Sequence, residues 1–369
     1  MGPLNIHFQK KNIETMAANY EDRDTLFNFV VKEGNGVKGL IDSGMSCVPQ
    51  PFVQPLSERI ATPNGQTCEA VQPIDLSQID GPCHTEVAKQ IVEAAETLGF
   101  FQIKCKWQVV NHGVSVELLE LLKMSAHEFF EQPPENKAVY LKEVSPSKLV
   151  KYGTSFVPEK EKAIEWKDYV ALDFLKSSMA MVKRIVEVLM EDVGVILEEE
   201  RMNSLVGTKM VNMNYYPTCP SPELTIGVGR HSDMGMLTVL LQDSIGGLYV
   251  KPDNGDWAEI PPLNGALVIN VGDTLQIRLY LEYFSKALYK ILSTDSKQWE
   301  GSNHKHRIER LSVPIFTAPT PSEKIGPLPE VVERDGVARY KEVLFQDYMN
   351  NFFSQPHDGK KSLDFARAD

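Results

Sequence analysis

The chain changes from helical to strand patterning near Lys209, and this change limits the folds that it can adopt. Upstream, apolar residues recur at helical spacing over residues 86–98, 116–130 and about 172–205. Downstream, short β-rich runs are separated by Gly, Pro, Asn and Asp; they lie at residues 210–216, 237–242, 247–250, 257–260, 266–271 and 311–317. Regularly spaced short strands predict an all-β sandwich or barrel, here preceded by a helical region.

Two further strands and a closing helix complete the expected secondary structure. Residues 73–76 and 100–103 are predicted strands, and residues 337–353 a last helix. Residues 1–60 are punctuated by Gly and Pro, with one apolar run at 26–31, which indicates an irregular arm over the surface. We therefore expect an irregular arm (1–60), a region of helices and strands (61–205), a β-core (206–335) and a C-terminal helix and tail (336–369).

Composition argues against several kinds of partner. The formal net charge of −12 argues against binding to nucleic acid or to an anionic membrane. The five cysteines are scattered and never form a C-x-x-C pair, which is typical of a reducing compartment. No apolar stretch reaches the roughly 18 residues needed to span a bilayer, and the first residues have no signal-peptide core. We expect a cytoplasmic protein, and nothing in the sequence demands more than a monomer.

His231 and Asp233 form an H-x-D tripeptide in the strand-rich region, just before the apolar run at 237–242. On an extended chain, residues i and i+2 project to the same face, so the imidazole and the carboxylate point at one place. With a second histidine from a distant strand they would form the 2-His-1-carboxylate triad of non-haem Fe(II) oxygenases. Arg310 and Ser312 begin the last strand of this region, where an inward-facing arginine and hydroxyl can hold a carboxylate.

From about Thr25 to its C-terminus, the chain resembles the plant 2-oxoglutarate/Fe(II)-dependent dioxygenases. The motifs that carry the resemblance are G-F-F-Q at 99–102, V-N-H-G-V at 110–114, N-Y-Y-P-x-C-P at 214–220, H-x-D at 231–233, G-G-L at 246–248, V-I-N-V-G-D at 268–273 and R-x-S at 310–312. Within that family, residues 228–233, 325–329 and 357–361 look like those of feruloyl-CoA ortho-hydroxylases and related coumarin-type hydroxylases.

The resemblance implies a mixed α/β chain whose mainly all-β core is a double-stranded β-helix, or jelly roll, holding Fe(II) and 2-oxoglutarate. Carried over residue by residue, the iron ligands would include His231 and Asp233. The residues that bind 2-oxoglutarate would be Arg310, Ser312, Asn214 and Tyr216. The implied reaction is hydroxylation of a small phenylpropanoid-type aromatic, a hydroxycinnamoyl-CoA or a coumarin, by O2. It is coupled to oxidative decarboxylation of 2-oxoglutarate to succinate, with ascorbate as the expected reductant.

The chain departs most from the family pattern at the third iron ligand. The family has its second histidine in the segment that corresponds to residues 278–298, and here that segment contains none. The downstream candidates are His306 and, as an alternative, His304. Two other places also differ: residues 103–108 carry two lysines in an expected strand, and the family has additional pocket-forming residues after Tyr169.

The sequence leaves three interpretations open. The first is an active hydroxylase that uses His306 or His304 as the third ligand. The second is an inactive or impaired family member with a mis-spliced or frame-altered ligand segment, because fewer donors hold Fe(II) more weakly. The third is a non-enzymatic jelly-roll binding protein. The presence of H-x-D, R-x-S and N-x-Y in one region favours the first, whereas His112 and His127 are expected to be structural.

Overall fold

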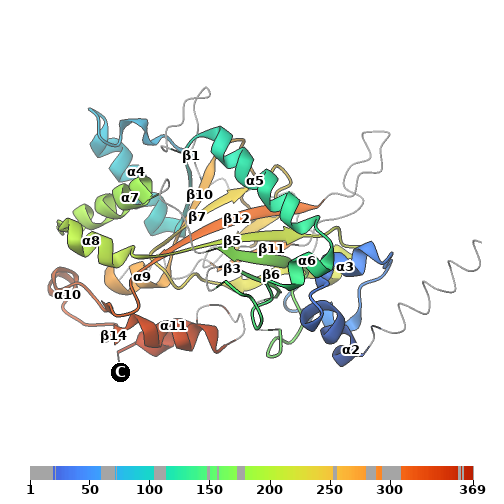
Figure 1. Ribbon diagram of the computed structural model, residues 1–369. Coiled ribbons are helices and arrows are strands. Elements are labelled where there is room, and N and C mark those ends of the chain that lie inside the picture. Colours follow the sequence, from blue (N-terminus) through green and yellow to red (C-terminus); the bar gives the residue numbers. More distant parts are fainter. Residues whose placement is uncertain are drawn as a thin grey trace, which may run out of the picture.

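Two β-sheets that face each other form the centre of the molecule (Figure 1). The computed structural model describes residues 20, 22–59, 71, 73–103, 114–147, 150–155, 158–172, 179–251, 256–279, 288–292, 309–355, 359 and 361–368. None of the helices within these ranges combines the length and apolar character that crossing a bilayer requires.

The larger sheet has eight strands in the order β1-β2-β10-β7-β12-β5-β4-β3. Their bounds are β1 (Pro73–Ile74), β2 (Phe100–Ile103), β10 (Leu267–Val271), β7 (Leu237–Gln242), β12 (Arg310–Ala318), β5 (Thr208–Tyr216), β4 (Asp168–Leu172) and β3 (Val150–Thr154). The smaller sheet, in the order β6-β11-β8-β9, contains β6 (Ile226–His231), β11 (Leu288–Leu292), β8 (Leu248–Lys251) and β9 (Ala258–Glu259). Near the C-terminus, β13 (Lys324–Ile325) pairs with β14 (Val343–Leu344).

The two-residue period of the strands divides the larger sheet into an outer and an inner face. On β7, Leu237, Val239 and Leu241 belong to the hydrophobic cluster under the helices. Leu240, by contrast, packs with residues of the smaller sheet, and Thr238 lines the cavity between the two sheets. Strands β5, β10 and β12 alternate in the same way. The register of each strand therefore decides which side chains can reach the cavity.

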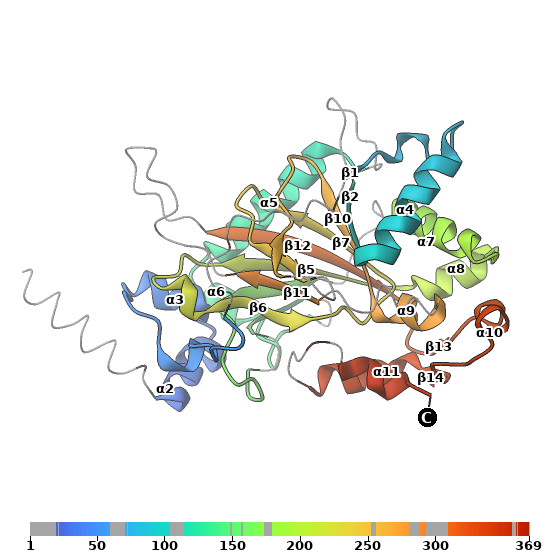
Figure 2. The same cartoon turned by 180° about the vertical axis from the view of Figure 1, so that it is seen from behind.

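Helices cover the outer face of the larger sheet (Figures 1 and 2). They include α4 (His84–Leu98), α5 (Val116–Phe130), α7 (Met179–Asp192) and α8 (Glu199–Leu205). Val87, Ile91, Ala95 and Leu98 bury one side of α4, as the helical spacing predicts. Gly99 then adopts φ 71°, the left-handed conformation that favours glycine at a helix end.

The sequence prediction for the strand-rich region is confirmed, because all six predicted runs overlap strands of the two sheets. The predicted helices at 86–98 and 116–130 and the strand at 100–103 are also confirmed, as α4, α5 and β2. The strand at 73–76 is shorter than predicted: β1 ends at Ile74, and a 3-10 turn follows at Leu76–Gln78.

The irregular arm predicted for residues 1–60 is wrong for the part that the structure describes. This part contains α2 (Arg23–Phe27), a π-helical turn (Asn28–Lys32) and α3 (Gly36–Asp42). The Asp168 carboxylate of β4 accepts hydrogen bonds from the backbone N–H groups of Val37 and Lys38, at 2.8 and 2.9 Å. Short helices interrupted by glycines give no sustained period, so the sequence pattern missed them.

Two long helical predictions also need correction. The helix expected over about 172–205 is β4, which ends at Leu172, followed by α7 and α8, with Gly194 at φ 79° between the two helices. The closing helix expected at 337–353 is only α11 (Phe345–Phe353). A separate helix, α10 (Pro329–Asp335), ends earlier at Gly336, which adopts φ 73°. Left-handed glycines follow α7 and α10, and the apolar period alone did not show these breaks.

Candidate active site

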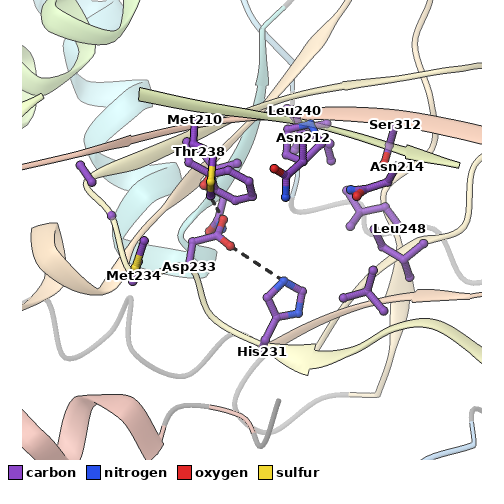
Figure 3. Close-up of a pocket in the computed structure, with 18 of the residues that line it drawn as sticks. Met210, Asn212, Asn214, His231, Asp233, Met234, Thr238, Leu240, Leu248 and Ser312 are labelled. Atoms are coloured by element: carbon purple, nitrogen blue, oxygen red, sulfur yellow. Dashed lines mark hydrogen bonds and ion pairs between the residues drawn. The ribbon is translucent and has the colours of Figure 1, made fainter. Parts of the chain in front are cut away.

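A cavity lies between the two sheets and is lined by four of the residues that the sequence singled out. His231, Asp233, Asn214 and Ser312 all line it, and Figure 3 shows their side chains around one space. His231 is the last residue of β6, and Asp233 follows in the connection to β7. The other two come from the inner face of the larger sheet, on β5 and β12. Residues far apart in the sequence are thus brought to one place.

The imidazole of His231 points toward the carboxylate of Asp233 (Figure 3). Its Nε2 lies 3.8 Å from Asp233 Oδ1. Its Nδ1 lies 2.8 Å from the carbonyl oxygen of Gly229, two residues earlier on the same strand. A carbonyl oxygen only accepts, so Nδ1 carries the proton and Nε2 presents a lone pair. In this tautomer Nε2 is the nitrogen that could bind a metal.

The carboxylate of Asp233 is held through its other oxygen. The Thr238 hydroxyl and the Asn270 amide both donate to Asp233 Oδ2, the latter at 2.7 Å. The backbone carbonyl of Asp233 also accepts a hydrogen bond from the N–H of Asp273, at 2.7 Å. The side chain and the backbone of Asp233 are therefore both fixed, and Oδ1 is the oxygen turned toward His231.

The guanidinium of Arg310 is completely buried at the start of β12. Its Nε donates to the carbonyl oxygen of Gly246, and its Cζ lies 4.9 Å from the centroid of the Tyr216 ring. Its Nη1 and Nη2 are buried and have no hydrogen-bond partner among the described residues. A buried cation with two unpaired donors is costly unless an anion completes it. Arg310 therefore fits one carboxylate in a two-bond geometry.

Strand register places three more predicted residues beside Arg310. On the neighbouring β5, Tyr216 is the register partner of Arg310, and Asn214 is the partner of Ser312. The Tyr216 hydroxyl lies 3.5 Å from Ser312 Oγ. The Asn214 Oδ1 atom is buried and has no partner among the described residues. The four predicted carboxylate-binding residues thus form one group of neighbours.

No cluster of three or more His, Cys, Asp or Glu side chains able to hold a metal is found among the described residues. The two candidates for the third ligand, His306 and His304, lie outside those residues, as does His112. His127 lies on α5, where its Nδ1 is 3.6 Å from Glu309 Oε1 and its ring packs edge-on against Tyr215. These contacts lie on the outer side of β5, away from the cavity. This position agrees with the expectation that His127 has a structural role and is not a metal ligand.

The described atoms fit a divalent iron and a dicarboxylate. Metal bonds to a histidine nitrogen and a carboxylate oxygen are each about 2.1 Å long. The 3.8 Å between Nε2 of His231 and Oδ1 of Asp233 is shorter than two such bonds together, so one ion can reach both atoms. The unpaired Nη atoms of Arg310 suit the distal carboxylate of a bound dicarboxylate such as 2-oxoglutarate.

Several cavity residues were not singled out by the sequence patterns. They are Thr238 and Asn270, which hold Asp233, and Lys167, Asn212, Phe352 and Phe353, which line the cavity. Thr238, Asn270 and Asn212 are polar residues on the inner face of apolar strands, so the alternation pattern could have found them. Phe352 and Phe353 belong to α11, and no local pattern connects that helix with the strands.

Comparison with known proteins identifies the family. The family described as the 2OG-Fe(II) oxygenase superfamily matches residues 207–319, and the one described as non-haem dioxygenase in morphine synthesis N-terminal matches residues 71–184. Scopoletin 8-hydroxylase of Arabidopsis thaliana is 72% identical over 96% of this chain and 100% of its own length. The chain belongs to the 2OG-Fe(II) oxygenase superfamily. It is therefore an oxygenase that uses Fe(II) and 2-oxoglutarate.

Other members of the superfamily agree with this assignment. A feruloyl CoA ortho-hydroxylase of Ipomoea batatas is 45% identical over 92% of this chain and 96% of its own length. The crystal structure of JOX2 in complex with 2OG, Fe and JA matches with a TM-score of 0.73 and 27% identity, covering 90% of this chain and 97% of JOX2. The fold is the double-stranded β-helix of these oxygenases, as predicted. The comparisons give no support to an inactive member or to a non-enzymatic binding protein.

Proposed function

We propose that this oxygenase hydroxylates a coumarin, scopoletin, on its aromatic ring at position 8. The observation that carries the proposal is the 72% identity with a scopoletin 8-hydroxylase along the full length of that protein. The hydroxylases of the thioester feruloyl CoA are at 45% or below among the relatives compared. The cavity itself suits a flat aromatic ring, because its walls include Phe100, Val228, Leu240, Leu248 and Val268.

In this proposal, His231 and Asp233 bind the iron, and His306 supplies the third ligand, with His304 as the alternative. Three protein ligands on one side of the ion leave positions for 2-oxoglutarate and O2. When bound, Fe(II) and 2-oxoglutarate would activate O2, the oxidant, with oxidation of 2-oxoglutarate to succinate and CO2. The hydrogen bond from His231 Nδ1 to the Gly229 carbonyl would orient the imidazole before the metal binds. The hydrogen bonds from Thr238 and Asn270 to Asp233 Oδ2 would orient the carboxylate in the same way.

We expect Thr238→Val to weaken Fe(II) binding about tenfold, because outer partners of metal ligands typically contribute ten- to hundredfold to metal affinity. The substitution removes one of the two side-chain donors to Asp233 Oδ2 and keeps the shape of the side chain. Anaerobic titration with Fe(II) in the presence of 2-oxoglutarate measures the change. Thr317→Val is the matched control, because the Thr317 hydroxyl donates to the Leu237 carbonyl outside the cavity. Equal losses in both variants would contradict a role for Thr238 in holding the ligand.

The same proposal assigns 2-oxoglutarate to the buried group around Arg310. Its two Nη donors would bind the distal carboxylate, and the hydroxyl of Ser312 would donate to the same carboxylate. Asn214 and Tyr216, the register partners on β5, would complete this end of the cavity. Phe352 and Phe353 of α11 line the cavity as well. Their rings would help to exclude water while the aromatic substrate is bound.

A direct assay separates the two candidate substrates. We expect the purified protein, supplied with Fe(II), 2-oxoglutarate and ascorbate, to convert scopoletin and to release one succinate per hydroxylated product. Feruloyl-CoA should give a kcat/KM at least about tenfold lower, which corresponds to about 1.4 kcal/mol of transition-state binding. The product is identified by mass spectrometry and proton NMR. A preference for feruloyl-CoA, or succinate release without any hydroxylated coumarin, would refute the assignment of scopoletin.

The remaining functional assignments extend the same proposal. Ascorbate would act as the reductant that keeps the iron in its ferrous state. The protein would work as a monomer in the cytoplasm, since its acidic charge and scattered cysteines suit that compartment.

A further inference from the structure

Lys167 is a buried cation on the wall of an otherwise mainly apolar cavity. It lies just before β4, is 7% exposed, and lines the same cavity as His231 and Asp233. Burying an ammonium group is costly unless it is paired and hydrogen-bonded. An apolar side chain at this position would avoid the free-energy cost of burying the charge, which indicates that the charge has a function.

Glu165 fixes the position of this ammonium group. Nζ of Lys167 lies 3.1 Å from Glu165 Oε2, and Oε1 of Glu165 accepts a hydrogen bond from the N–H of Gly229, at 2.8 Å. Burial alone lowers the pKa of Lys167, but nearby acidic groups, Glu165 first and then Tyr216, outweigh this effect and raise its pKa. The side chain is therefore a fixed ammonium ion rather than a neutral amine.

Gly229 links this ammonium to the proposed iron ligand. Its N–H donates to Glu165, and its carbonyl accepts from Nδ1 of His231. One residue of β6 thus fixes both the carboxylate that holds Lys167 and the imidazole of His231. The ammonium and the imidazole are held at set positions on the wall of one cavity.

An ammonium has three N–H donors, and Glu165 is the only ion-pair partner of Lys167 Nζ among the described residues. The ring of Tyr169, with its centroid 5.9 Å from Nζ, covers part of the ammonium without accepting a conventional hydrogen bond. Donors thus remain for a ligand in the cavity. The fitting acceptor is an oxygen of negative or partly negative character on a small aromatic molecule.

We infer that Lys167 recognises the phenolic oxygen on the ring carbon next to the one to be hydroxylated, and that Glu165 positions Lys167. The inference rests on the proposed function and adds how the substrate is oriented. In scopoletin this oxygen is the free hydroxyl beside position 8, which can bind as phenol or phenolate. Because Lys167 and His231 are both fixed through Gly229, an oxygen bound to Lys167 holds the adjacent ring carbon in a set place relative to the metal ligands.

The test compares two ligands that differ only at that oxygen. These are scopoletin and its methyl ether, in which the free hydroxyl is capped. Equilibrium dialysis under anaerobic conditions, with Fe(II) and 2-oxoglutarate present, gives both dissociation constants. We expect Lys167→Met to reduce the preference for scopoletin over its ether by roughly ten- to hundredfold, the usual contribution of a charged hydrogen bond. The visible absorption of the Fe(II)/2-oxoglutarate complex should stay unchanged.

Two further variants keep the test decisive. Glu165→Gln/Lys167→Met removes both charges, so that no unpaired carboxylate is left buried, and should lose the same preference. Lys137→Met is the matched control: Lys137 is 2% exposed, donates to the carbonyl of Phe130 at 2.8 Å and does not line the cavity. It should leave the preference unchanged even if it lowers stability.

The outcomes separate this inference from the proposed function. If the unaltered protein binds scopoletin and both Lys167 variants keep its full preference over the ether, Lys167 is not the recognition residue and the proposed function stands. If the unaltered protein neither binds nor hydroxylates scopoletin, the proposed function fails and this inference fails with it. Loss of the preference in both Lys167 variants, but not in Lys137→Met, supports the inference.

Discussion

Replacing Arg310 by methionine is expected to weaken 2-oxoglutarate binding by a factor of a few hundred. Each hydrogen bond between charged partners contributes about 1.5–3 kcal/mol, so the loss of two amounts to at least about 3 kcal/mol. The structure gives the reason: both Nη atoms are buried without a partner among the described residues, so the carboxylate of the co-substrate is their natural complement. Arg310→Lys should restore little, because a lysine cannot make the paired contact.

The measurement is a thermal-shift titration with 2-oxoglutarate, supported by the KM for 2-oxoglutarate. A ligand that binds the folded state raises the melting temperature, so the unaltered protein should be stabilised and Arg310→Met should not. Arg278→Met is the matched control, because Arg278 is 2% exposed but pairs with Glu323 at 3.2 Å, outside the cavity. It should lower stability and keep the response to 2-oxoglutarate. An undiminished response in Arg310→Met would contradict the assignment of the co-substrate site.

Local pattern predicted β5, β7, β8, β9, β10 and β12 and most of the described candidate site, but it missed β3, β4, β6 and β11. Strands such as β7 and β12 are short, strongly apolar and bounded by turn residues, so their position follows from composition alone. Once a strand is placed, its two-residue period puts Arg310 and Ser312 on one face. The same two-residue reasoning paired His231 with Asp233 in the sequence, and their side chains do lie together although Asp233 lies beyond the end of β6.

The parts that pattern missed depend on contacts between distant segments. The sequence patterns did not single out Lys167, whose buried partner Glu165 is held by Gly229, 64 residues further along the chain from Glu165. The N-terminal helices are short, and α3 is anchored by Asp168, more than a hundred residues away. No window of sequence contains either pair of partners, so only the folded chain shows why these residues are where they are.

The second large effect is expected at the third iron ligand, where His306→Ala should abolish turnover and weaken Fe(II) binding more than about a hundredfold. A facial triad reduced to two protein ligands has fewer donors and a looser geometry, and loss of a direct ligand exceeds the ten- to hundredfold effect of an outer partner. Anaerobic titration of Fe(II) with 2-oxoglutarate, followed by the visible charge-transfer band, measures binding independently of turnover. His84→Ala is the control, because the His84 ring contacts the carbonyl of Ile79 at 2.6 Å and lies outside the cavity.

The two candidate histidines can be told apart by the same titration. His304→Ala should keep the band if His306 is the ligand, and the reverse result would assign the ligand to His304. Both residues belong to the segment between β11 and β12. β11 pairs with β6, which carries His231, and β12 carries Arg310. The connection between these strands therefore begins after Leu292, the register partner of Ile226, and ends at Arg310 of the proposed 2-oxoglutarate site. If both variants keep the band and full turnover, neither histidine binds the iron, and the third ligand must come from elsewhere in the chain.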